Sequence, residues 1–331
     1  MNAKRISRDS TKLLFVVWIA LTFQALPVRA WNNVGHRTIA ELVWRKLDKD
    51  ERQAVSDLLK QHPHYKSILT ADVPRGVDKN EWAFLMAANW PDMVRPAKHG
   101  QRSKPHSVTK YDLYPHAIGY PFMLSRDTNR VSLEDFYIAK PDAEMVLSNS
   151  FANLKNVKAT ASDRAVSLCW ALHLCGDLHQ PLHAANLVTK KRPRGDSLGG
   201  HHIVRVEGER QIDLHSFWDQ LPGVNPSYQT AAALADELNA APELKPQKLK
   251  DLEQHKTIAS WVQESFHLAV DFAYAEDRMQ FVHEEDVESG KIPTSAIPTL
   301  SEDFIKDARK IARQRLVLAA ERIALELKQT W

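Results

Sequence analysis

The stretch Ala-Leu-His-Leu-Cys-Gly-Asp-Leu-His-Gln-Pro-Leu-His, residues 171–183, indicates both a helix and a chemical site. His173 and Asp177 are four residues apart, so on a helix they project from one face, close enough to share a cation. Pro181 is expected to end that helix and to turn His183 back towards the same place. Because imidazole and carboxylate ligands together suit zinc, the stretch predicts a metal site built on a helix.

A second pair with the same spacing strengthens this interpretation. His215 and Asp219 stand four apart in Leu-His-Ser-Phe-Trp-Asp, residues 214–219. A single pair of this kind favours an ordinary surface or hydrogen-bonded histidine, but two pairs in one chain favour metal binding. Asp92 in Asn-Trp-Pro-Asp and His116 in Tyr-Pro-His add an acid and an imidazole, although each segment alone would be explained as a turn.

Most of the remaining chain has helical periodicity. Ile39, Val43 and Leu47 repeat every four residues and predict the first helix, a second begins near residue 50, and a third should stop at Pro91. We expect helices over residues 80–89, 141–155, 162–180, 227–240, 258–280 and 301–328. We expect one strand pair, residues 202–206 and 211–214. The sequence predicts a mainly α protein, a single helical domain over residues 31–331 with a small β-hairpin.

Residues 1–30 have the pattern of an export signal. They contain a basic leader, an apolar run over residues 13–26 and small residues before a cleavage point after Ala30. The alternative, an uncleaved membrane anchor, is disfavoured because the apolar run is short for a membrane span. We therefore expect a signal peptide, a mature chain that begins at Trp31 and a secreted or periplasmic protein.

The charge balance limits how this protein can attract phosphate. The predicted leader carries five basic residues and one acidic residue, so its removal changes the formal net charge from +3 to −1. A protein that grips nucleic acid with a broad basic face should be visibly basic. Attraction for phosphate must therefore come from local groups or from bound cations.

Both cysteines of the chain and one histidine of the stretch 171–183 are predicted to be structural. Cys169 and Cys175 are six apart on the predicted helix and point to different faces, so a disulfide between them is not expected. Core packing is the ordinary role of such thiols. His179 lies on a different face of the same helix from His173 and is assigned a structural role.

The predicted mature N-terminus adds an unusual ligand. A freed α-amine titrates near about 7.7 to 8.0 and can lose its proton to a metal. The amine and carbonyl oxygen of Trp31 can then chelate one ion, with His36 nearby in Trp-Asn-Asn-Val-Gly-His, residues 31–36. The alternative is a tryptophan that only packs against the first helix.

Taken in order, these motifs resemble the S1/P1 nuclease family of zinc enzymes, whose mainly helical fold is shared with the bacterial zinc phospholipases C. The resemblance covers at least residues 31–219 and rests on Trp31, Gly35, His36, Trp90, Asp92, His116, His173, Asp177, His183, His215 and Asp219.

The resemblance implies three zinc ions. One would be held by Asp92, His116, His173 and Asp177. A second would be held by His183, His215 and Asp219. The third would be held by Trp31 and His36, with Asp177 bridging it to the first. Every one of these positions carries the residue type that the family uses.

The resemblance also implies hydrolysis of single-stranded DNA or RNA to 5′-phosphate products, with removal of 3′-phosphates from nucleotides as an additional activity. Arg95 matches a basic residue that the family places near the scissile phosphate, and a guanidinium fork suits phosphate. Catalysis is thus assigned to Asp92, Asp177 and Arg95. The alternative for Arg95 is an ordinary surface arginine. No stable protein partner is implied.

Three positions depart from the family pattern. Ala117 replaces a usual aromatic residue, Gly119 replaces an acidic or amide residue, and His201 replaces an asparagine. Loss of the aromatic removes a base-stacking contact typically worth about 1 to 3 kcal/mol. His201 is the candidate for the missing polar contact with substrate, and His202 is an alternative. We expect weak substrate binding with little preference among bases.

Two other functions fit parts of the pattern. A phospholipase C or another phosphodiesterase could use the same metals, although those phospholipases characteristically have glutamate where this chain has Asp219. A zinc-binding protein without catalysis is compatible with the altered pocket. Turnover of nucleic acid and of phosphatidylcholine would separate the three.

Overall fold

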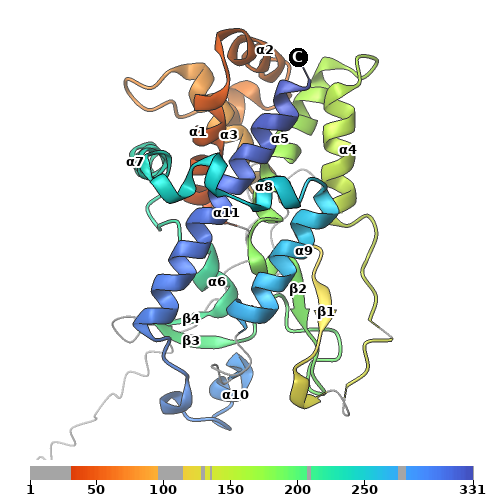
Figure 1. Ribbon diagram of the computed structural model, residues 1–331, viewed down its shortest axis with the longest axis vertical. Coiled ribbons are helices and arrows are strands. Elements are labelled where there is room, and N and C mark those ends of the chain that lie inside the picture. The colour runs from red at the N-terminus through yellow and green to blue at the C-terminus, as the bar shows by residue number, and fades with distance from the viewer. Residues whose placement is uncertain are drawn as a thin grey trace, which may run out of the picture.

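The computed structural model describes residues 31–95, 115–127, 131–134, 136–206, 210–274 and 281–330. The predicted signal peptide, most of the loop 95–110 and the turn of the predicted hairpin lie outside these residues. In Figure 1 the helices α1 to α5 gather at one end, the two small sheets lie towards the other, and α11 runs along both. Among the described helices, none is long and apolar enough to cross a membrane.

The mainly α fold with a small β element is confirmed. The helices are α1 (Asn33–Lys46), α2 (Lys49–Leu59), α3 (Lys79–Val94), α4 (Ala143–Lys155), α5 (Ala161–Asp177), α6 (Leu214–Asp219), α7 (Tyr228–Ala240), α8 (Asp251–Gln254), α9 (Ile258–Leu268), α10 (Glu284–Glu288) and α11 (Glu302–Lys328). Short 3-10 turns join several of them, including one over Pro181–His183 that forms the end of the stretch 171–183.

Side-chain caps fix where the helices that carry the candidate site begin. The Asn32 side chain accepts hydrogen bonds from two amides of the first turn of α1. Thr160 caps α5 and Asp213 caps α6 in the same way. Each cap satisfies backbone donors that would otherwise lack a partner. The start of each helix, and with it the direction of the side chains on it, is therefore set by local sequence.

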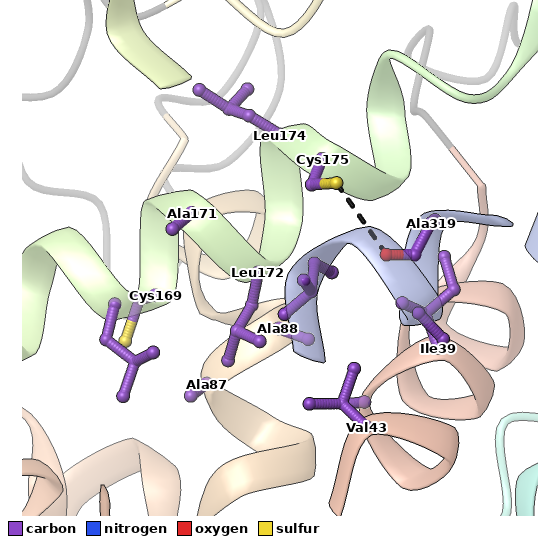
Figure 2. Close-up of a cluster of buried hydrophobic side chains, with 14 of the residues drawn as sticks. Ile39, Val43, Ala87, Ala88, Cys169, Ala171, Leu172, Leu174, Cys175 and Ala319 are labelled. Carbon is purple, nitrogen blue, oxygen red and sulfur yellow. Dashed lines mark hydrogen bonds between the residues drawn. The ribbon is translucent and has the colours of Figure 1, made fainter. Parts of the chain in front are cut away.

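The core lies where α1, α3, α5 and α11 pack against one another. Figure 2 shows Leu172 of α5 beside small residues of α3, including Ala87, while Val43 of α1 approaches from another side. Cys175 points at α11, with its sulfur 3.8 Å from the carbonyl oxygen of Ala319. Both cysteines are buried and free, as predicted.

Two sheets complete the fold, and one of them was not predicted. Strands β3 (Ile203–Val206) and β4 (Arg210–Asp213) form the expected antiparallel hairpin. Strands β1 (Tyr120–Phe122) and β2 (Ala185–Leu187) pair in parallel. A three-residue strand has too few positions to show alternation, so the sequence carried no signal for this pair. Its pairing brings the segment after His116 alongside the segment after His183.

Two predicted helix boundaries were wrong. Helix α3 does not stop at Pro91 but continues to Val94. The turn before this proline packs against α5, where the His173 ring donates to the Ala88 carbonyl over 2.7 Å, and tertiary packing of this kind supports a helix that contains proline. The predicted helix over 258–280 ends as α9 at Leu268 and is followed by a wider turn over Ala269–Ala273, and residues 275–280 lie outside the described part of the chain.

Candidate metal centre

Six segments bring the predicted ligand side chains together. Helix α5 contributes His173 and Asp177, α6 contributes His215 and Asp219, and single residues come from α1, α3, the segment before β1 and the 3-10 turn after α5. All are at most 6 % exposed: His36, Asp92, His116, His173, Asp177, His183, His215 and Asp219. Buried polar side chains in such number require partners, because burial removes their water.

Asp177 lies at the middle of the first group. Its Oδ2 is 3.1 Å from His116 Nδ1 and 3.2 Å from His173 Nε2. Its other oxygen, Oδ1, is 3.2 Å from His36 Nε2. Asp92 closes the group, with Oδ1 3.9 Å from His116 Nδ1. The carboxylate of Asp177 therefore presents one oxygen to each side, as a carboxylate shared between two cations would.

The second group consists of His183, His215 and Asp219. His183 Nε2 and His215 Nε2 are 3.3 Å apart, and His215 Nε2 is 3.3 Å from Asp219 Oδ2. Gln180 donates to the other oxygen of Asp219 over 2.9 Å. Within this centre, ligand-type atoms lie within 4.8 Å of one another in three sets, which are His36, His173 and Asp177; Asp92, His116 and His173; and His183, His215 and Asp219.

Backbone carbonyls fix the orientation of three of the rings. His173 Nδ1 donates to Ala88, His183 Nδ1 donates to His116 over 2.7 Å, and His215 Nδ1 donates to Leu198 over 2.8 Å. Since a carbonyl oxygen only accepts, Nδ1 carries the proton and Nε2 keeps a lone pair in each neutral ring.

This protonation pattern tests whether the residues fit a metal. In the second group, two Nε2 atoms face each other at 3.3 Å, and two lone pairs at that distance repel. A positive charge, either a proton or a metal ion, is needed between them. Metal ions displace such protons when the ligands are otherwise placed for coordination. A set of imidazoles and carboxylates in this arrangement fits zinc.

Burial and neighbouring charges shift the pKa values of these side chains in different directions. Burial lowers the pKa of His183 to about 3 and that of His116 to about 4. Burial alone would raise the pKa of Asp177, but interactions with His173 and hydrogen bonds from the surrounding rings hold it well below its usual range. Burial would lower the pKa of His173 and His215, but the neighbouring Asp177 raises that of His173, and Asp219 raises that of His215 to about 9. Burial raises the pKa of Asp219 to about 7. Protons therefore supply part of the positive charge in this centre, and metal binding would release them.

Two glycines allow the first turn of α1 to approach this centre. A Cβ on Gly176 would lie 3.0 Å from His36 Nδ1, so the glycine lets the ring lie directly against α5. A Cβ on Gly35 would lie 2.7 Å from the Cβ of Trp31, which is fully buried. The amide of Asn32 donates to the Asp219 carbonyl over 3.2 Å. The start of α1 thus lies between the two groups.

The other predicted site residues lie at the edge of the centre. Arg95 ends α3, with Nη1 3.3 Å from Asp92 Oδ1, and its side chain is 32 % exposed. His201 is half-buried, with Nε2 3.0 Å from the Ser197 hydroxyl. His202 is buried with Nε2 2.8 Å from Asp196 Oδ2, so it lies against an internal carboxylate. The substrate roles of Arg95 and His201 stay predictions.

The structural role assigned to His179 is confirmed. Its Nδ1 donates to the Cys175 carbonyl over 2.6 Å, and Arg322 donates to its Nε2 over 2.7 Å. Arg315 and Arg322 both bond Glu264, and sequence reasoning missed this network. The signal was available, because two arginines seven residues apart interrupt the apolar face of the last helix.

Comparison with known proteins shows the family to which the chain belongs. The sequence model of the S1/P1 nuclease family matches residues 31–331. This chain belongs to the S1/P1 nuclease family. It is similar to Endonuclease 1 of Arabidopsis thaliana, with 24% identity over 343 residues, 98% of this chain and 94% of that protein. It is also similar to Nuclease S1 of Aspergillus oryzae, with 24% identity over 57% of this chain and 53% of the relative. The chain is therefore a hydrolase of phosphodiester bonds that acts on nucleic acid.

Proposed function

We propose that this nuclease is an exported three-zinc enzyme that cuts single-stranded DNA and RNA to 5′-phosphate products and also removes 3′-phosphates from nucleotides. The observation that carries the proposal is Asp177, whose two oxygens face separate histidines. Asp92, His116, His173 and Asp177 would hold one ion, and His183, His215 and Asp219 another. His36 and the freed amine and carbonyl of Trp31 would hold the third, with Asp177 shared.

In this proposal the residues of the chain orient the metal ligands and the phosphate, and the ions would supply the Lewis acid chemistry. Bound zinc lowers the pKa of water towards neutrality and neutralises developing charge on phosphoryl oxygens. The carbonyls that fix the histidine rings keep the ligand set in place. Arg95, held beside Asp92 and partly exposed, is suited to orient a phosphate entering from solvent.

The burial of the ligand atoms supports a preference for single strands. The ligand side chains are at most 6 % exposed, so a phosphate must reach inwards to meet them. A flexible single strand can bend its backbone into such a site, whereas duplex DNA is stiff over the length of a binding site. The phosphate group is common to DNA and RNA, which supports activity on both.

A side-by-side turnover assay tests this function. Purified enzyme is supplied with single-stranded DNA, single-stranded RNA, duplex DNA, a 3′-nucleotide and phosphatidylcholine at one salt concentration. We expect faster cleavage of both single strands than of the duplex, 5′-phosphate ends and release of phosphate from the 3′-nucleotide. Robust headgroup release without strand cleavage would overturn the proposed substrate, and equal rates on single strands and duplex would overturn the preference.

Export is a separate part of the proposal, supported by the pattern of residues 1–30. Expression of the full chain in a bacterium, followed by fractionation and N-terminal sequencing, tests it. We expect the protein outside the cytoplasm with Trp31 as its first residue. Full-length protein retained in the cytoplasm would contradict both export and the free amine.

A further inference from the structure

The loop that joins β2 to β3 has an unusual backbone next to the candidate metal centre. Gly195, Ser197, Leu198 and Gly199 have φ angles of 88°, 58°, 61° and 86°. Glycine adopts such angles without cost, but Ser197 and Leu198 are consecutive residues with a Cβ in the left-handed region. Backbone of this kind persists only where surrounding contacts hold it.

Asp196 supplies these contacts from inside the loop. The residue is fully buried. Its Oδ1 accepts from the Leu187 amide over 3.0 Å, and its Oδ2 accepts from the Gly199 amide over 3.1 Å. The Tyr274 hydroxyl lies 2.9 Å from Oδ2 and 3.1 Å from Oδ1, so the phenol donates to the carboxylate. A buried carboxylate with this set of donors is oriented from several sides.

Asn186 holds the same loop from β2. Its Oδ1 accepts from the Leu198 amide over 3.3 Å. A Cβ on Gly195 would lie 2.3 Å from the same side-chain amide, so this position excludes any larger residue. Asn186 of β2 therefore contacts the loop at Gly195 and Leu198, and Asp196 holds the loop at Gly199.

One peptide group links Asp196 to a candidate metal ligand. The peptide between Leu198 and Gly199 gives its N–H to Asp196, while its carbonyl accepts from His215 Nδ1 over 2.8 Å. A hydrogen bond at the N–H side polarises a peptide and strengthens acceptance at its carbonyl side. The orientation and tautomer of His215 therefore depend on Asp196 through a single planar group.

We infer that Asp196 is a positioning residue for the metal ion that His183, His215 and Asp219 would hold. The inference rests on the proposed zinc set and adds a residue outside it. The inference also predicts that a change at Asp196 affects only one of the three metal sites. The carbonyls that orient His173 and His183 belong to Ala88 and His116, which lie outside this loop. Removing the charge of Asp196 should therefore lower the metal affinity of one site and leave the other two unchanged.

Metal affinity in Asp196→Asn tests the inference without relying on turnover. The substitution keeps the shape of the side chain but removes its charge and half of its acceptor capacity. Zinc is titrated into metal-free full-length protein against a competing chelator, and cobalt spectra are recorded in parallel. We expect one of three ions to bind about 10- to 100-fold more weakly, as for other groups that orient metal ligands, with the other two unchanged.

Ser150→Ala is the matched control. Its buried hydroxyl donates to the Val146 carbonyl within α4 over 2.7 Å, away from the β2–β3 loop. This variant should retain all three affinities. Tyr274→Phe is the milder test in case Asp196→Asn folds poorly, because it leaves the carboxylate and its bond to Gly199. It should weaken the same single ion by less than the asparagine variant does.

The outcomes separate the inference from the function on which it rests. Wild-type protein that fails to bind three ions contradicts the proposed zinc set. Wild-type protein that binds three while Asp196→Asn and Tyr274→Phe bind all three equally well contradicts the inference. Uniform weakening of every site, in step with a lower melting temperature, assigns Asp196 to general stability and also overturns it.

Discussion

Two buried polar clusters in this fold differ in the source of the positive charge that neutralises their carboxylates. The arginine–glutamate cluster consists of His179, Glu264, Arg315 and Arg322. Arg315 Nη1 donates to Glu264 over 2.8 Å, and Arg322 donates to both oxygens of Glu264 over 2.7 Å. Here the positive charges are attached to α11. The Glu264 carboxylate is satisfied by these two guanidinium groups, whose hydrogen bonds hold α9 against α11.

In the candidate metal centre, the shared carboxylate of Asp177 faces imidazoles instead of guanidinium groups. Among the described residues, the charged-type partners of Asp177 are the imidazoles of His36, His116 and His173. These rings carry positive charge only when protonated. Burial lowers the pKa of His116 to about 4, whereas Asp177 raises the pKa of His173 against the effect of burial. Part of the positive charge beside Asp177 is therefore a proton that a metal ion can replace, and not a fixed charge of the chain.

The comparison shows that proximity of ligand-type atoms does not by itself indicate a metal. Asp251, His255 and Glu264 also offer ligand atoms within 4.8 Å of one another. The Glu264 carboxylate is already occupied by two guanidinium groups, so we assign no ion there. Charge balance, more than spacing, separates the two clusters.

The largest expected effect is the loss of the shared carboxylate. We predict that Asp177→Asn lowers kcat/KM on single-stranded DNA by about 10³-fold or more, because metal stabilisation of several kcal/mol is lost. The matched control is Asp251→Asn, taken from the group that we expect to hold no ion, which should stay within about twofold of wild type. A large activity loss in the control, or none in Asp177→Asn, would remove the distinction between the clusters.

Breaking the arginine–glutamate cluster should affect stability instead of chemistry. Glu264→Gln leaves two buried guanidinium groups without their counter-charge, which typically costs about 3 to 5 kcal/mol of unfolding free energy. Denaturant unfolding at fixed zinc concentration provides the measurement. Metal content per folded molecule should match wild type, and a lower content would mean that this cluster contributes to metal binding.

A smaller effect is expected at the N-terminus. An additional methionine before Trp31 removes the free amine and should weaken one ion by about 10- to 100-fold while the fold is kept. Zinc titration of this protein is compared with that of protein processed to begin at Trp31. Equal affinities in the two forms would show that the terminus is not a ligand.

The smallest effect concerns Ala117, which directly follows the candidate ligand His116. Restoring an aromatic residue with Ala117→Tyr should lower KM on single strands by about 5- to 30-fold, which corresponds to about 1 to 2 kcal/mol from the lower part of the range for a stacking contact, with little change in kcat. Homopolymers of each base provide the measurement. A change confined to kcat would place residue 117 in the chemical step.

The pairs on α5 and α6 could be predicted because both members stand on one helix. For His173 with Asp177, and for His215 with Asp219, helical spacing alone fixes a shared face. The order of these motifs with Trp31, Asp92 and His116 then indicated the family before any geometry was available. The positions of the main helices followed from apolar periodicity.

The remaining features depend on contacts between distant segments. Nothing near Asp196 in the sequence indicates that Tyr274 donates to it, because the two meet only after β2, β3 and α9 are in place. The parallel pair β1–β2 had too few residues to show a pattern. The continuation of α3 past Pro91 depends on its packing against α5, which local propensity does not contain.

Metal analysis of protein processed to begin at Trp31 tests the central claim most directly. The account predicts three zinc ions per chain, which a chelator removes together with activity and with part of the thermal stability, while the arginine–glutamate cluster stays formed. A reproducible content of one ion or none would contradict it.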